Sequence, residues 1–151
     1  MCSKKRIEDK LNFIQNSSYT KNIIRFSTKK GKKEISEKNL RKSFYHFSKL
    51  NKQENFLNYI KLAVKKTSVC FSIKIKRKGS KNINTPIYLH KNKQLFLKYK
   101  LLLENLDKKH YSEDKYYKRL ILSILDTTEN KSIAVKKKTE LYKLIEENMN
   151  I

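Results

Sequence analysis

Apolar and polar residues alternate along two neighbouring runs of the chain, residues 69–76 and 83–89. A period of two is typical of a β-strand with one apolar and one polar face. The polar segment between the runs contains Gly79, one of only two glycines in the chain, and suits a turn. The pattern therefore predicts a β-hairpin over residues 69–89. A bare two-stranded ribbon is marginally stable in water, so we expect its base to rest on neighbouring helices.

Elsewhere the apolar residues recur with helical spacing. The predicted helices are one over residues 22–28, one starting at Ser36, one starting with a capping box at 51–54, one marked by apolar residues 95–106, one starting at Ser112, and a last one between 132 and 148. The apolar stripes expected in the core are Leu40, Phe44 and Phe47; Phe56, Tyr59, Ile60, Ala63 and Val64; Leu95, Tyr99, Leu102, Leu103 and Leu106; Tyr117, Leu120, Ile121, Ile124 and Leu125; and Ala134, Leu141, Leu144 and Ile145. We therefore expect a mainly α fold with about six helices and one hairpin protruding between the third and fourth.

The pattern divides the chain into two parts. Residues 1–18 are polar and are predicted to form a basic, extended N-terminal arm, a composition that suits a mobile tail as well as a phosphate contact. Residues 19–151 are long enough for one helical domain with a single core. No apolar run approaches the length of a membrane span. No Cys or His pair has zinc spacing, so neither a metal nor a cofactor is expected.

Charge changes this picture from a plain helical domain to one with a polyanionic partner. The 151 residues include 37 Lys and Arg against 14 Asp and Glu, a formal charge of +23. Such a charge repels itself in a compact state, which favours a nucleic-acid partner. A genome rich in A and T is an alternative source of part of the lysine excess.

The basic residues gather in three motifs: the hairpin, a lysine-rich turn around Gly31, and a lysine run at 136–138. In the turn, Gly31 is expected to act as the C′ residue of the preceding helix. A solvated helix end is the alternative interpretation of these lysines. The candidate RNA contacts are Lys29, Lys30, Gly31, Lys32, Lys33, Arg41, Lys74, Lys76, Arg77, Lys78, Gly79, Lys81, Lys91, Lys93, Lys136, Lys137 and Lys138.

The order of these motifs is itself informative. Phe44-Tyr45 and Leu62-Ala63-Val64 precede the hairpin, and Asn82 and Pro86 follow Gly79 within it. The most specific stretch is residues 126–138, an Asp-Thr-Thr run followed by polar residues and then Ala-Val-Lys-Lys-Lys. Together they resemble the bacterial-type small-subunit ribosomal protein S-seven family, whose turn reads Arg-Asp-Gly-Lys-Lys and whose C-terminal run ends in Ala-Val-Lys-Lys-Lys.

The chain also departs from that family. Ser80 replaces the second turn glycine, Lys100-Leu101-Leu102 replaces an Arg-Trp-Leu motif, and residues 34–39 look like an insertion. The sequence ends at Ile151, where the family usually continues with an aromatic and basic tail. Lysine in place of arginine implies point-charge rather than bidentate recognition of phosphates.

The resemblance implies a structural, non-enzymatic protein. Family members bind the 3′ major domain of small-subunit ribosomal RNA, help to assemble the head together with neighbouring head proteins, and place their hairpin near the exit-site tRNA and the mRNA path. The lysine-rich drift and the absence of a signal-type or transit-type leader lead us to expect the mitochondrial matrix, in the mitoribosome, with the plastid ribosome as the alternative.

Two other classes of function share some of these sequence features. A nuclease is disfavoured because the few acids, such as Asp107 and Asp114, are not combined with a histidine in a catalytic motif. An organellar DNA-binding or nucleoid protein shares the positive charge, but it does not need a hairpin between helices. Competition between ribosomal RNA and duplex DNA discriminates between these readings.

Overall fold

The computed structural model describes residues 17–50, 55–104, 106 and 115–149. Over these residues the element order is α2 (Ser18–Ser27), α3 (Lys33–Leu50), α4 (Phe56–Lys66), β1 (Phe71–Lys78), β2 (Lys81–Tyr88), α5 (Lys91–Glu104), α6 (Tyr116–Thr128) and α7 (Ile133–Met149). The prediction of six helices with a hairpin between the third and fourth is confirmed. The arm predicted for residues 1–18 falls almost wholly outside the described residues, and Ser17 already serves as the N-cap of α2.

The apolar stripes of five helices form one core. Phe47 of α3, Ile60 of α4, Leu102 of α5 and Ile124 of α6 each expose at most 1% of their surface and belong to one cluster, which α2 completes with Ile23. Removing such side chains from water is the main source of stability in a domain this polar. The sequence pattern therefore located the core correctly for these helices.

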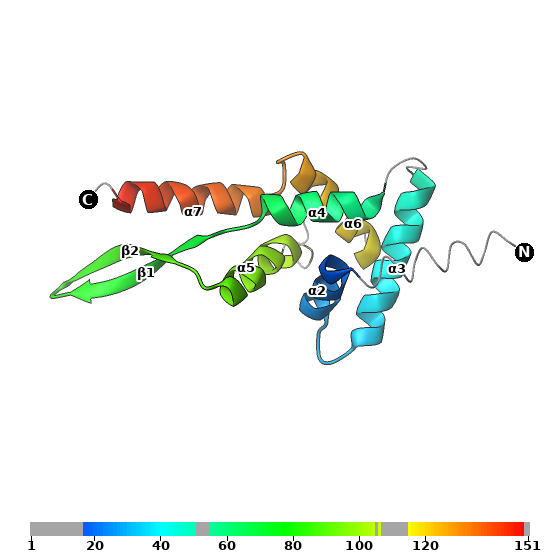
Figure 1. The fold of residues 1–151 in the computed structure, drawn as a ribbon, viewed down its shortest axis with the longest axis horizontal. Helices are drawn as coiled ribbons and strands as arrows, with labels where there is room; N and C mark the ends of the chain where they lie inside the picture. The colour runs from blue at the N-terminus through cyan, green and yellow to red at the C-terminus, as the bar shows by residue number, and fades with distance from the viewer. Residues whose placement is uncertain (1–16, 51–54, 105, 107–114, 150–151) are drawn as a thin grey trace, which may run out of the picture.

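The hairpin, residues 71–88, extends from this body, and its tip forms one extreme of the described part of the molecule (Figure 1). We call this hairpin the arm from here on. The strands pair antiparallel from Phe71 opposite Tyr88 to Lys78 opposite Lys81, which leaves a two-residue turn. Gly79 is the first turn residue, with φ of +64°, as in the type II′ turns that match the twist of paired strands. The residue Val69, just before the strands, is fully buried and anchors the arm in the body.

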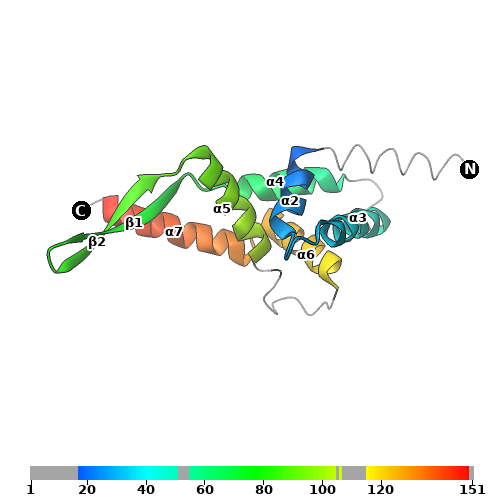
Figure 2. The same ribbon diagram turned by 90° about the horizontal axis from the view of Figure 1, so that it is seen from below.

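Helix α7 supports the base of the arm. It lies beside both strands, and the two views show the arm continuing past it (Figures 1 and 2). The Cys70 N–H donates to the Tyr142 hydroxyl oxygen at 3.2 Å, and Ile145 of the same helix is buried. The expectation that a two-stranded ribbon needs a helix at its base is met in this way.

Three local expectations are wrong. The helix expected to start at Ser36 begins instead at Lys33, and Ser36 is buried inside it. Gly31 is not a C′ residue either, because α2 ends with extended Thr28, whose N–H and hydroxyl both donate to the Ile24 carbonyl. Leu144 is 46% exposed, because the inward stripe of α7 is formed by other residues, such as Ile145.

Two further helix starts cannot be compared with the structure. The capping box at 51–54 and the start at Ser112 lie outside the described residues. The described parts of those helices begin at Phe56 and Tyr116. No helix in the described ranges is both long enough and apolar enough to cross a membrane.

Candidate nucleic-acid interface

The strand register sorts the arm's cations onto two faces. Cross-strand partners share a face, so Lys74, Lys76 and Lys78 lie on the same face as Lys81, the partner of Lys78. We call these four residues the lysine stripe. All four are exposed, and none is in an ion pair with any residue that the structure describes. Arg77, opposite Asn82, lies on the other face.

Neither face of the arm is purely polar. The register sets Ile83 beside the stripe, opposite Lys76, while Ile75 lies on the Arg77 face and is 65% exposed. Ile75 and Ile83 therefore point to opposite sides of the ribbon. The lysines can contact phosphates, and the exposed apolar side chains between them can contact riboses or bases. This combination suits RNA better than a surface that carries charge alone.

The turn around Gly31 is sharply folded. Lys30 and Gly31 have φ of +51° and +72°, and the Lys32 N–H donates to the Lys29 carbonyl at 3.1 Å. All five residues of the turn are exposed, although Lys33 lies 3.6 Å from Glu37 on the next turn of α3. The turn joins α2 to α3 and lies apart from the arm (Figure 1).

The lysine run of α7 has mixed roles. Lys136 is exposed, whereas the Lys137 ammonium lies 2.9 Å from a Glu104 carboxylate oxygen. The Lys138 ammonium donates to the Lys66 carbonyl at 2.9 Å at the end of α4, where cations are favourable. Two of the three predicted contacts therefore help to hold α7 against the body.

The remaining predicted contacts lie on two helices. Lys91 and Lys93 are exposed in the first turn of α5, directly after the arm. Arg41 is exposed on α3. The first two continue the basic surface of the arm toward the body, and Arg41 does not.

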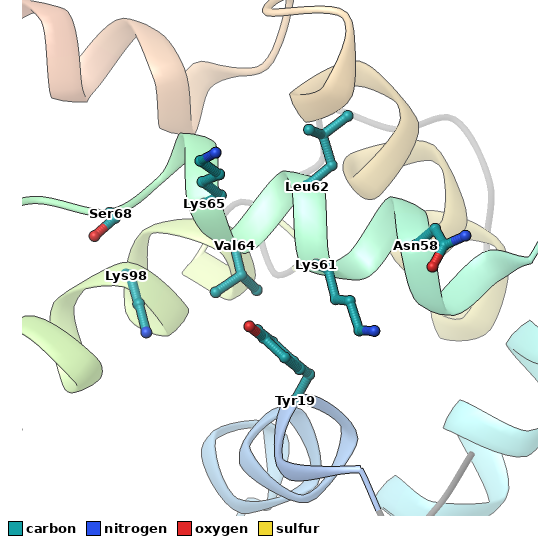
Figure 3. A pocket seen from close by; sticks show the side chains of 8 residues that line it. All are labelled: Tyr19, Asn58, Lys61, Leu62, Val64, Lys65, Ser68 and Lys98. Atoms are coloured by element: carbon teal, nitrogen blue, oxygen red, sulfur yellow. The ribbon is translucent and has the colours of Figure 1, made fainter. Parts of the chain in front are cut away.

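The structure also brings together a group of lysines that the sequence did not single out. Lys61 and Lys65 of α4 and Lys98 of α5 line a depression of about 520 Å³ that is also lined by Tyr19 of α2. We call it the lysine depression. Figure 3 shows Lys61 and Tyr19 directed toward the same space, with Lys98 on the α5 side.

The sequence held only a partial signal for this depression. Lys61 and Lys65 are four residues apart and so share a helix face, but that pattern usually marks a solvated surface. Only the packing of α2 and α5 against α4 turns the face into a concavity, and long-range packing is not readable from local periodicity. The depression therefore could not be predicted from the sequence alone.

In the described part of the chain, no three His, Cys, Asp or Glu side chains are placed to hold a metal ion. His46 lies against Tyr117, with ring centroids 5.6 Å apart, and its buried Nδ1 has no hydrogen-bond partner among the described residues. What the surface offers is fixed positive charge on a rigid scaffold.

Comparison with known proteins agrees with this chemistry. Residues 2–149 match the family model described as ribosomal protein S7p/S5e. The chain is 31% identical over 135 residues to the small ribosomal subunit protein uS7 of Wigglesworthia glossinidia brevipalpis, covering 88% of this chain and 83% of the relative. It is 26% identical over 149 residues to the small ribosomal subunit protein uS7c of Bigelowiella natans, covering 99% of this chain and 92% of the relative. It is 22% identical over 126 residues to uS7 of Stenotrophomonas maltophilia strain K279a, covering 83% and 79%.

Proposed function

The chain belongs to the ribosomal protein S7p/S5e family, and from this premise we propose that it binds the 3′ major domain of small-subunit ribosomal RNA and helps to assemble the head. As a family member it is a structural protein of the small ribosomal subunit and not an enzyme. The proposal concerns which RNA it contacts and through which residues.

The observation that carries the proposal is the lysine stripe on a projecting arm. Four exposed ammonium groups on one face of a ribbon can follow a phosphate backbone, and the arm can enter a gap between RNA segments that the helical body cannot. Folded RNA is recognised mainly through shape, phosphates and 2′-hydroxyl groups, which requires positioned cations rather than a reading helix. The family's placement of the hairpin near the exit-site tRNA and the mRNA path fits the same geometry.

The remaining candidate contacts extend this footprint. The turn at residues 29–33 and exposed Lys136 offer further phosphate contacts, while Lys91 and Lys93 connect the arm to the body. Together they suit a protein that touches several RNA segments and neighbouring head proteins. The alternative function is an organellar DNA-binding or nucleoid protein, which would use the same charge without preference for RNA structure.

We propose the mitochondrial ribosome as the location of this protein, on the basis of the lysine-rich composition. The plastid ribosome is the alternative, and the similarity to the uS7c of Bigelowiella natans supports it. Separating the two organelles and probing each ribosome fraction for this chain decides between them.

Competition binding tests the proposed RNA preference. The full chain is bound to a labelled fragment of the 3′ major domain at physiological salt, and unlabelled fragment or duplex DNA of equal length is added. We expect the RNA fragment to compete at least about a thousandfold better, the lower end of the range for specific over non-specific nucleic-acid binding. Equal competition by the two nucleic acids would support the nucleoid-binding alternative.

A further inference from the structure

The lysine depression is built from three helices that are distant in sequence. Lys61 and Lys65 come from α4, Lys98 from α5 and Tyr19 from α2, and the buried Val64 side chain lies beneath them. Helices α2 and α5 pack on each other, as do α4 and α5, so the depression is part of the rigid body rather than of a loop. Ser68, in the segment that leads from α4 to the arm, is the one lining residue outside a helix.

The polar lining of the depression consists of groups that can donate hydrogen bonds. The three ammonium groups are joined by the Tyr19 hydroxyl, the Asn58 amide and the Ser68 hydroxyl, and no carboxylate lines the space. None of the three lysines is in an ion pair with a described residue. A surface of donors without acids fits a ligand rich in acceptors and negative charge, as phosphate and ribose oxygens are.

The lysines also repel one another. Lys61 and Lys65 are like charges at i and i+4 on α4, an arrangement that destabilises an isolated helix. An anion placed between them and Lys98 removes that repulsion. A bound anion therefore makes the arrangement of charge at these three lysines more favourable.

Size limits the ligand. At about 520 Å³ the depression falls within the range of about 300–1,000 Å³ that holds small molecules, so it admits a nucleotide but not a double helix. An unpaired nucleotide that projects from folded RNA presents both phosphates and an exposed base or ribose. The half-buried Tyr19 ring supplies the aromatic surface for the latter.

We propose that the lysine depression binds an unpaired nucleotide of ribosomal RNA together with its adjoining phosphates, as a contact separate from the lysine stripe. The inference rests on the proposed function, because it names a second RNA element for a protein already assigned to RNA. The protein then holds two RNA segments at a fixed relative position.

The test replaces Lys61, Lys65 and Lys98 with Gln, which removes the charges and keeps most of each stem. The matched control replaces Lys38, Lys42 and Lys143, three exposed lysines outside every proposed site. Affinity for the 3′ major domain fragment is measured over a range of salt concentrations. Each phosphate contact on unpaired RNA releases about 0.7 counterions. For the variant that lacks three lysines, we therefore expect the slope of log affinity against log salt concentration to be about 2 units less steep. Its affinity near 0.15 M salt should be lower than that of the wild type by about fiftyfold.

Chemical footprinting on the same RNA separates this proposal from the proposed function. Nucleotides that lose protection in the depression variant should be unpaired and different from those that lose protection when the lysine stripe is neutralised. If the depression variant behaves like its control while the stripe variant loses affinity, the inference fails and the proposed function stands. If neither variant changes RNA binding, both fail. If the depression variant loses as much affinity for fully paired RNA as it does for the 3′ major domain fragment, the assignment to an unpaired nucleotide is overturned.

Discussion

Neutralising the lysine stripe is the perturbation that bears most directly on how the arm works. Replacing Lys74, Lys76, Lys78 and Lys81 with Ala removes four charges from one face of the ribbon and leaves Arg77 on the other. If each lysine meets one phosphate, the salt slope falls by about 0.7–0.9 per lysine, or about 3 in all. The two proteins should bind about equally at about 1 M salt, and 0.15 M salt lies ~0.8 decades lower. At about 0.15 M the variant should therefore bind the RNA about 2.5 decades more weakly than the wild type.

The fold should tolerate this change. All four side chains are exposed, so each replacement is expected to alter the free energy of unfolding by at most about 0.5 kcal/mol. Lys78 and Lys81 face each other across the ribbon, and removing that like-charge pair offsets part of any loss. Thermal unfolding followed by circular dichroism checks that the helices remain.

The assay is binding to the 3′ major domain fragment from low to high salt. The matched control replaces Lys21, Lys38, Lys42 and Lys143, which lowers the net charge by the same amount at exposed positions elsewhere. Arg77→Ala reports separately on the opposite face. The reasoning is refuted if the stripe variant and the charge-matched control lose affinity equally, since only net charge would then matter.

Three further predictions concern the scaffold. Lys138→Ala should lower the free energy of unfolding by about 1–2 kcal/mol because its charged bond to the Lys66 carbonyl is lost, while Lys136→Ala should change it by less than about 0.5 kcal/mol; denaturant titration compares them, and equal effects would contradict the assignment. Burial raises the pKa of Tyr99 above 10.0 despite a hydrogen bond with Asn22, so the unfolded chain loses this proton first as pH rises. The stability contributed by the protonated Tyr99 hydroxyl is complete below pH ~10 and is lost above it. Denaturant titrations should therefore show that the wild type loses stability relative to Tyr99→Phe as the pH rises above ~10. A difference between the two proteins that does not change with pH would contradict the raised pKa. Gly79→Ala forces a side chain into a left-handed turn at a cost of about 1–2 kcal/mol, and hydrogen exchange should quicken in the arm but not in the helices; unchanged exchange in the arm would show that the turn does not need glycine.

Local pattern was sufficient for the elements whose residues define their own environment. The alternation through residues 69–89 with a glycine at the turn predicted the arm, and the stripe from Phe56 to Val64 predicted α4 and its buried face. In these stretches periodicity, turn chemistry and burial agree, which is why sequence alone places them.

Features that depend on neighbouring elements were not predictable in this way. The start of α3 is set by a tight turn in which Lys33 bonds to the Gly31 carbonyl, so Ser36 falls inside the helix. Leu144 is exposed because α7 packs along the edge of the body and the base of the arm rather than across the core. The lysine depression likewise exists only once α2, α4 and α5 are packed together.

The central claim is that this chain works as a structural part of a small ribosomal subunit, and sedimentation tests it most directly. An extract from cells that make the protein is run on density gradients at moderate and high salt, and the chain is followed by mass spectrometry. We predict that it migrates with the small subunit and its ribosomal RNA at moderate salt. Migration as free protein, or together with DNA, would contradict the account.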